Sequence, residues 1–382
     1  MIIRKLRRFH TKGACACIGV LLLLTSFHMH NYPNKSDYKN TKLPESVCRK
    51  YHPPSSTTLT GFIQRRENNL IYYCDVPKCG SAFMKNFFAE AFSCRDCYYK
   101  KVNLPHKRKQ YKYVKHKIEN STYSFMFVRE PYSRLFSIFE NKLYRPNEQW
   151  GKLGVDVIKV VRENATKLCK QYGYDVTFVE LVRYLVTLYE KKIPLNIHLV
   201  PIHKRCNPCN TRFDFIGKQE SMTSDLIKLV SLWKKRGINV DFESSVDVKE
   251  LELKSKRDFG AIMHMFTMLS RFPDLPRHLL YQRLWSSYQM RGLILNNQIM
   301  PFRQDLVDDI DMLMYELAIK DAIEQSAHEF NVLQQQRKDA LMKAYRTVPM
   351  DLLLSLRNVL KIDCELFGYD VMPESIFNRT YS

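Results

Sequence analysis

The stretch Leu70-Ile-Tyr-Tyr-Cys-Asp-Val-Pro-Lys-Cys-Gly-Ser-Ala-Phe83 decides the fold, because it passes from a strand-like pattern to a turn and then to a helix-like pattern. Its first seven residues are mostly apolar, β-branched or aromatic, which predicts a buried strand. Residues 77–81 have the composition of a turn. Phe83, Phe87 and Ala91 then recur four residues apart, which predicts a helix directly after the turn.

The same strand–turn–helix pattern occurs twice more. Residues 124–128 read as a second strand, and Pro131 suits the first turn of a helix that runs to about Leu143. Residues 213–217 read as a third strand, followed by a helix from about Thr223. Strands that alternate with helices predict an α/β fold with a central parallel sheet flanked by helices on both faces.

Composition and charge narrow the class of protein. Apolar residues make up 45% and charged residues 26% of the 382 residues, which is typical of a globular chain and excludes wholesale disorder or a fibrous structure. The 60 Lys and Arg residues exceed the 39 Asp and Glu residues and give a net charge of +21. Such an excess favours an extended polyanion as partner: nucleic acid, an anionic membrane surface or an acidic polysaccharide.

The N-terminus indicates a membrane anchor. Residues 1–12 carry five basic and no acidic residues and are predicted to be a cytosolic tail, and residues 13–29 are predicted to be a transmembrane signal-anchor helix. A cleavable signal peptide is the alternative, but bulky residues follow the apolar run where a cleavage site needs small ones. Either interpretation sends the rest of the chain into the secretory lumen, so we expect no nucleic-acid partner.

The lumenal part divides by composition. Residues 30–65 are rich in Asn, Pro, Ser, Thr and Lys and are predicted to be a stem. Residues 66–382 are predicted to form the lumenal catalytic domain, in which residues 245–345 are mostly helical and carry no chemical motif.

The cysteines fit an oxidising compartment. Cys94 and Cys97 form one C-x-x-C pair and Cys206 and Cys209 another, which in the cytosol would suggest zinc. The two pairs are more than a hundred residues apart, so we expect disulfides rather than a metal site, and the sequence does not give their connectivity. We interpret Cys206 and Cys209 as a structural pair of a lumenal protein. Acceptor sequons for N-glycosylation occur at four positions: Asn34, Asn120, Asn164 and Asn378.

Two sequence segments suggest anion binding. Lys78, Gly80 and Ser81 lie in a turn between a strand and a helix, where free N–H groups, the helix dipole and the lysine charge favour a phosphate. Arg129, at the end of the second strand, and Ser137, eight residues later, form a second possible clamp. Either segment alone is as consistent with a structural connection.

Together the segments resemble a known family. Tyr73-Cys-Asp-Val-Pro-Lys-Cys-Gly-Ser81 and Phe127-Val-Arg-Glu-Pro-Tyr-Ser-Arg-Leu-Phe-Ser137 resemble the two donor-binding motifs of sulfotransferases. His198-Leu-Val-Pro-Ile-His-Lys-Arg-Cys-Asn-Pro-Cys209 with Phe213-Asp-Phe-Ile-Gly-Lys-Gln-Glu220, and Asp363-Cys-Glu-Leu-Phe-Gly-Tyr369, are similar to blocks of the Golgi carbohydrate sulfotransferases, the group of chondroitin 4-O-, dermatan 4-O- and HNK-1-type enzymes.

The resemblance implies a P-loop-like sulfotransferase fold and 3′-phosphoadenosine 5′-phosphosulfate as the sulfate donor. It also implies that Lys78 acts on the leaving oxygen, and that Arg129 and Ser137 hold the 3′-phosphate. The cofactor-binding residues so implied are Pro77, Lys78, Cys79, Gly80, Ser81, Ala82, Phe83, Lys85, Arg129, Arg134 and Ser137. A salt bridge on the helix face is an equally good interpretation of Arg134. The chain departs from the family at Ala82, where a hydroxyl residue is usual, and at Met84, where Trp is usual.

A catalytic base and an acceptor site complete the expectations. His106 and His198 are the two candidates for the base that accepts the proton of the acceptor hydroxyl, with Glu90 a weaker third. Residues 98–118 contain eight basic and no acidic residues interleaved with tyrosines, which suggests a groove for an acidic glycan with Lys107, Arg108 and Lys109 as substrate-binding residues. A solvated basic loop is the alternative.

The expected function is transfer of sulfate to a glycan hydroxyl, most readily a chondroitin- or dermatan-type glycosaminoglycan, by a single-pass type II protein of the Golgi membrane. Two alternatives stay open. One is sulfation of an HNK-1-like glycoprotein glycan, and the other is a catalytically inactive lumenal protein that binds polyanions.

Overall fold

The computed structural model describes residues 43–51, 60–66, 69–91, 100–103, 122–240 and 259–379. The strands are β1 (Thr60–Arg66), β2 (Asn69–Cys74), β3 (Lys100–Asn103), β4 (Thr122–Val128) and β5 (Phe215–Lys218). The helices of the N-terminal half are α2 (Glu45–Lys50), α3 (Ser81–Ala91), α5 (Pro131–Phe139), α6 (Val155–Val161), α7 (Lys167–Tyr172), α8 (Phe178–Glu190), α9 (Ile202–Cys206) and α10 (Met222–Lys235). The later helices are α12 (Gly260–Met268), α13 (Arg277–Met290), α14 (Met312–Ser326), α15 (Phe330–Arg346), α16 (Met350–Phe367) and α17 (Glu374–Phe377).

Short helices of other types join these elements. Two are π-helical, at Glu140–Tyr144 and Trp150–Gly154, and the 3₁₀ turns are Gln219–Ser221, Leu269–Arg271 and Gln304–Asp309. The first π-helix continues α5 without a break, so the helix expected to reach about Leu143 ends at Tyr144. Single π-helical turns are frequent at functional sites.

The described strands form one sheet in the order β3-β1-β2-β4-β5. Strands β2, β4 and β5 run parallel, as the alternation of strands and helices predicts. To this central parallel sheet the structure adds an antiparallel edge, because β1 pairs antiparallel with both β2 and β3. The cause is local: Arg66 of β1 pairs with Asn69 of β2, and a two-residue connection allows only an antiparallel hairpin.

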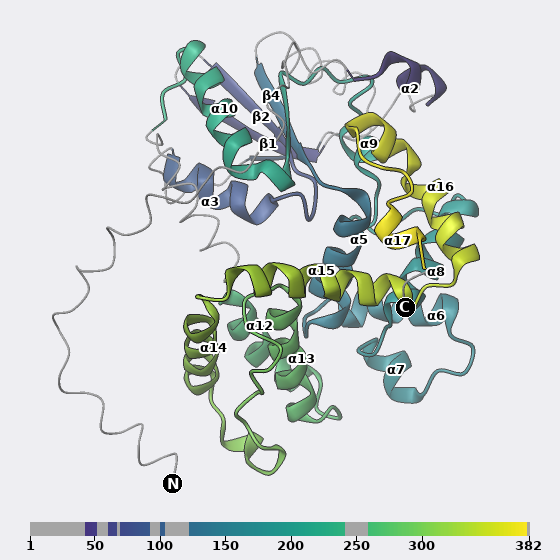
Figure 1. The fold of residues 1–382 in the computed structure, drawn as a ribbon, viewed down its shortest axis with the longest axis vertical. Coiled ribbons are helices and arrows are strands. Elements are labelled where there is room, and N and C mark those ends of the chain that lie inside the picture. The colour runs from purple at the N-terminus through teal and green to yellow at the C-terminus, as the bar shows by residue number, and fades with distance from the viewer. Residues whose placement is uncertain are drawn as a thin grey trace, which may run out of the picture. The chain divides into compact units, whose positions relative to one another are not determined.

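Helices cover both faces of the sheet, as predicted (Figure 1). Successive residues of a strand point to opposite faces, so Tyr73 and Phe125 pack with α3 and α10 on one face. Tyr72 and Met126 face the other way and pack with α9 and the end of α16. The predicted helix face of Phe83, Phe87 and Ala91 is buried, and the core around it is largely aromatic.

The C-terminal third is helical over its described residues, as expected for residues 245–345. Helices α12, α13 and α14 bury an aromatic and aliphatic cluster around Trp150 and Tyr281. Helices α5, α6, α8 and α16 bury a second cluster, to which Tyr345 of α15 also belongs. The indole of Trp150 donates to the carbonyl oxygen of Leu143 at 2.7 Å and so joins the two π-helices.

Two disulfides change the expected domain boundary. Cys48 on α2 bonds Cys209, and Cys74 at the end of β2 bonds Cys206. Cys206 and Cys209, expected as a structural pair, are therefore both in disulfides, each with a cysteine far away in sequence. Because Cys48 is tied to the fold and Thr60–Arg66 is a strand of the sheet, the folded domain begins well before residue 66.

The predicted anchor, residues 13–29, lies outside the described residues. Among the helices that the structure describes, none is both long and apolar enough to cross a membrane.

Candidate functional site

The turn between β2 and α3 has an unusual backbone. Lys78 has φ of +70° and Gly80 φ of +91°, so both lie in the left-handed region that residues other than glycine rarely adopt. The Ser81 hydroxyl donates to the carbonyl oxygen of Val76 at 2.8 Å and closes the turn. Strain of this kind clusters at ligand-binding loops, and here it precedes the N-terminus of an 11-residue helix.

The end of β4 places Arg129 against this turn. Its Nη1 donates to the carbonyl oxygen of Lys78 at 3.3 Å, and its Nε donates to the Ser133 hydroxyl at 3.0 Å. Glu130 caps α5 by accepting from the backbone N–H groups of Tyr132 and Ser133. Arg129 is only 7% exposed, so its guanidinium is held within the protein rather than in solvent.

The two segments meet at a pocket of about 400 Å³, here called the cationic pocket. Its lining residues are Asp75, Pro77, Lys78, Gly80, Ser81, Ala82, Phe83, Lys85, Arg129, Ser137, Asn141, Lys142, His198, Gln219, Met222 and Arg291. The pocket thus brings together Lys78, Arg129 and Ser137, as the sequence predicts, with His198 as a fourth group. Cationic side chains far outnumber the single carboxylate in this lining, so the pocket suits an anionic ligand.

The pKa values of the pocket follow from burial and from crowding of positive charge. Burial, together with Arg145, Arg291 and Arg129, lowers the pKa of Lys78 to about 7, against an opposing effect of Glu140. Burial lowers the pKa of the Arg129 guanidinium to about 10, with a nearby arginine, Arg337, acting in the same direction. An anion bound among these groups would relieve both effects.

The pKa of His198 is affected by the same burial and the same positive charges. Burial and the cations around it, Lys142 and Lys78 first among them, lower its pKa to about 4, so the imidazole is neutral at ordinary pH. Its Nδ1 atom is buried and finds no hydrogen-bond partner among the described residues. A neutral imidazole beside an anion site has the protonation state that a proton acceptor needs.

Arg134, expected as a cofactor-binding residue, has a different position. It is 5% exposed and is absent from the lining of the cationic pocket. Its Nε donates to the carbonyl oxygen of Pro77 at 3.1 Å, and its Nη2 donates to those of His198 and Val200, both at 3.0 Å. These acceptors are backbone carbonyls and not the carboxylate that a helix-face salt bridge would need. Arg134 joins the turn, α5 and the His198 segment.

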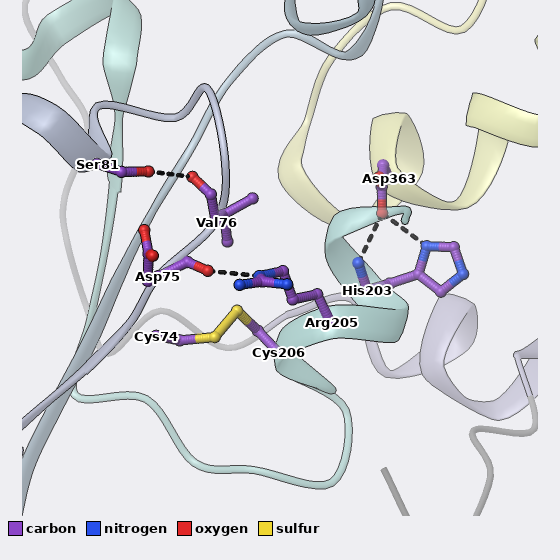
Figure 2. The surroundings of a disulfide bond; sticks show 8 residues. All are labelled: Cys74, Asp75, Val76, Ser81, His203, Arg205, Cys206 and Asp363. Carbon is purple, nitrogen blue, oxygen red and sulfur yellow. Dashed lines mark hydrogen bonds and ion pairs between the residues drawn. A yellow bond between two sulfur atoms is a disulfide. The ribbon is translucent and has the colours of Figure 1, made fainter. Parts of the chain in front are cut away.

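A disulfide and several hydrogen bonds connect the turn after β2, α9 and α16 (Figure 2). The Cys74–Cys206 disulfide joins the end of β2 to α9, and Arg205 donates to the carbonyl oxygen of Asp75 in the turn. Asp363 on α16 accepts from His203 Nδ1 at 2.6 Å and from the backbone N–H of His203 at 2.8 Å. The two family-like blocks around His203 and Asp363 are therefore one structural unit.

The end of the chain is fixed in the same way. The Tyr369 hydroxyl donates to Glu220 at 2.9 Å, and another oxygen of Glu220 accepts from the backbone N–H of Glu130 at 2.8 Å. Glu130 in turn caps the helix that carries Ser137. Residues far apart in sequence thus hold the two donor-motif segments in one arrangement.

Several expected site residues lie elsewhere. Cys79 is fully buried beside the pocket without lining it, and burial raises the pKa of its thiol to about 12. Glu90 is exposed on α3 and is also absent from the lining. His106, Lys107, Arg108, Lys109, Asn34 and Asn120 lie outside the described residues. Asn164 and Asn378 are exposed.

Five polar lining residues were not predicted from the sequence: Asp75, Asn141, Lys142, Gln219 and Arg291. Asn141 and Lys142 belong to the π-helix that follows α5, and Asn141 lies four residues after Ser137, a spacing that could have indicated a shared helix face. Arg291 follows α13, in the region where no motif was recognised, and no sequence signal pointed to it. Over the described residues, no cluster of three or more His, Cys, Asp or Glu could hold a metal ion.

Comparison with known proteins identifies the family of the chain. A model of the sulfotransferase family matches residues 61–257, just over half of the 382 residues, and the chain belongs to that family. It is 31% identical to carbohydrate sulfotransferase 14 of Danio rerio over 196 residues, 47% of this chain and 53% of the relative.

Other relatives bear names of the same kind. Human carbohydrate sulfotransferase 8 is 28% identical over 281 residues, 69% of this chain and 63% of the relative. Carbohydrate sulfotransferase 11 of Rattus norvegicus is 30% identical over 174 residues, 42% and 49% of the two chains. The matches span about half to just under two thirds of the length of these relatives. No solved structure matches.

Proposed function

We propose that the protein transfers a sulfuryl group from 3′-phosphoadenosine 5′-phosphosulfate to a hydroxyl group of a glycan. The observation that carries this proposal is the cationic pocket, in which the strained turn of Lys78 meets Arg129, Ser137 and His198. The donor has anionic groups at its 3′ and 5′ ends, which fits a pocket with cations from several separate segments. Family membership and the names of the relatives support the same reaction class.

The two donor-motif segments take different ends of the donor. The turn of residues 77–83, with the N–H groups at the start of α3, holds the 5′ side. Arg129 and Ser137 hold the 3′-phosphate, for which the planar guanidinium offers two parallel hydrogen bonds. Lys85, exposed on α3 at the edge of the pocket, adds charge to the 5′ side.

Transfer needs positioning and charge stabilisation rather than a covalent enzyme intermediate. The sulfur–oxygen bond to the 5′-phosphate breaks while sulfur bonds to the acceptor oxygen, and the products are adenosine 3′,5′-bisphosphate and a sulfate ester. Lys78 neutralises the charge that develops on the leaving phosphate oxygen. The proton of the acceptor hydroxyl passes to a base, for which neutral His198 lies in the pocket and His106 is the second candidate.

The acceptor is proposed to be a chondroitin- or dermatan-type chain. The high positive charge of the protein and the basic stretch with Lys107, Arg108 and Lys109 favour an acidic glycan. An HNK-1-like glycoprotein glycan is the competing candidate for the acceptor. Ala82, which lines the pocket without a hydroxyl group, is the one feature that favours an inactive polyanion-binding protein.

We place the protein in the Golgi membrane with its catalytic domain in the lumen. Two disulfides that close loops of 132 and 161 residues support an oxidising compartment. The basic tail and apolar run of residues 1–29 support a type II orientation.

The test is a transfer assay on the full chain, expressed in the secretory pathway and solubilised in detergent. Because Cys48 is bonded to Cys209, a truncation at the expected domain boundary would remove a disulfide. Labelled donor is supplied with a panel of desulfated chondroitin, dermatan, heparan and glycoprotein glycans, and a Lys78→Ala variant serves as the matched control. Label in chondroitin or dermatan that depends on Lys78 supports the proposal. Label in glycoprotein glycans alone would identify the HNK-1-like glycan as the acceptor. Binding of glycans without the donor and without transfer would identify an inactive polyanion-binding protein.

A further inference from the structure

One face of helix α13 contacts the π-helix that lines the cationic pocket. Arg283, Ser287 and Arg291 are spaced four residues apart and so share a face of the helix and its C-terminal cap. Arg283 Nε donates to the carbonyl oxygen of Tyr144 at 2.8 Å, and the Ser287 hydroxyl donates to Glu140. Both acceptors lie on the π-helix that supplies two lining residues of the cationic pocket. The third residue of the face, Arg291, lines that pocket itself.

The turn after α13 is fixed from a second side. Gln336 on α15 is 7% exposed, and its amide nitrogen donates to the carbonyl oxygens of Gln289 and Ile294 at 2.7 and 2.8 Å. Gly292 has φ of +66°, and a Cβ atom there would lie 2.3 Å from the carbonyl oxygen of Leu333. These contacts therefore fix the backbone conformation of the turn that follows α13. Arg291 is held at its place by helix, turn and neighbouring helix together.

The charge of Arg291 acts on Lys78. Arg291 is among the cations that lower the pKa of Lys78, so the two positive groups of this pocket repel each other. Glu140, the nearby carboxylate, already accepts the Ser287 hydroxyl. Two cations in the lining of one pocket favour an anionic group between them.

The donor has a third anionic group besides its two phosphates. The turn of residues 77–83 and the Arg129–Ser137 segment, both at strand ends, account for the phosphates. Arg291 comes from the helical region instead, and it neighbours Lys78, the residue at the end where sulfur leaves.

We propose that Arg291 binds the sulfuryl group of the donor and holds it during transfer. The inference rests on the proposed function. Sulfur exchanges its bond to the phosphate oxygen for one to the acceptor oxygen, and Arg291 neither gives nor takes a proton, because a guanidinium stays charged. Its planar fork matches two sulfuryl oxygens and leaves the line of attack free.

The test compares Arg291→Ala and Arg291→Lys with wild type in the full chain. Arg303→Ala is the matched control, because Arg303 is an exposed arginine paired with Asp305 on the surface of the same region. We expect Arg291→Ala to lower kcat by about 100-fold, the effect of removing one group that stabilises transition-state charge. Arg291→Lys should recover part of the rate, since it keeps charge without the fork. Affinity for adenosine 3′,5′-bisphosphate, which lacks the sulfuryl group, should not change.

Three results would overturn the assignment. They are a wild-type kcat in Arg291→Ala, an equal loss of affinity for the donor and the bisphosphate, and a rise in acceptor KM alone. If Arg291→Ala melts early, Arg291→Lys and Arg291→Gln give the comparison, and both must reduce kcat without changing bisphosphate affinity. A wild-type chain that transfers no sulfate would overturn the proposed function and this assignment together. If the wild-type chain transfers sulfate and replacing Arg291 does not change kcat, the role of Arg291 is overturned but the proposed function is not.

Discussion

Replacing Arg134 with alanine is expected to destabilise the fold and not merely to weaken donor binding. The guanidinium makes three partly buried hydrogen bonds, to the backbone carbonyls of Pro77, His198 and Val200. A hydrogen bond to a charged group contributes about 1.5–3 kcal/mol. Since the three share one side chain and their losses are not additive, we expect the free energy of unfolding to fall by about 3–5 kcal/mol.

Denaturant unfolding with the disulfides intact measures this change. The fluorescence of the buried tryptophans Trp150, Trp233 and Trp285 reports the transition. Arg134→Lys should lower the free energy of unfolding by an intermediate amount, because the compact ammonium group cannot reproduce the planar set of donors of a guanidinium. Arg303→Ala is the control and should change the free energy by less than about 0.5 kcal/mol, as expected at an exposed site.

A direct role of Arg134 in donor binding would give the opposite pattern. Arg134→Ala would then unfold within about 1 kcal/mol of wild type, inside the range of ordinary substitutions, yet fail to bind adenosine 3′,5′-bisphosphate. That result would refute the positioning role of Arg134.

Three further predictions concern the pH profile, the topology and the acceptor. Burial and neighbouring cations hold the pKa of His198 near 4, so the imidazole is neutral above about pH 5. We therefore expect that kcat/KM for the donor does not fall between pH 7 and 5.5. A fall in kcat/KM with a midpoint near pH 6.5, the ordinary histidine value, would contradict this. Asn164 is exposed, and glycosidase treatment should increase the mobility of the wild-type chain more than that of Asn164→Gln; equal shifts would show that this sequon is unused. Replacing Lys107, Arg108 and Lys109 with alanine should raise acceptor KM, less so at high salt, and leave donor KM unchanged, whereas equal effects on both substrates would point to misfolding.

The centre of the sheet was predictable from sequence because its signals are local. Strands β2, β4 and β5 are short apolar runs, each followed by a turn and an amphipathic helix, and this pattern requires parallel neighbours. The edge strands carry no such signal. Thr60–Arg66 lies in a polar region that resembled a stem, and Lys100–Asn103 lies in a basic stretch that resembled a loop, although lysine is common on edge strands.

The candidate site divides in the same way. Lys78, Arg129 and Ser137 follow strands directly, so their convergence at one end of the sheet could be expected. Arg134 could not be assigned, because its role depends on carbonyl groups about sixty residues away. Arg291 and the Cys48–Cys209 disulfide depend on contacts between distant segments, and the sequence records only the residues and not their partners.

The binding of adenosine 3′,5′-bisphosphate to Arg129→Ala tests the central claim most directly. Calorimetry on the folded variant, with a melting curve alongside, should show a loss of about 2–4 kcal/mol in binding free energy, the range for truncating one partner of a buried charge pair. Ser137→Ala should lose about 1 kcal/mol, as expected for one neutral hydrogen bond. Wild-type affinity in folded Arg129→Ala would mean that the end of β4 is only a structural junction, and it would contradict the assignment of the cationic pocket as the donor site.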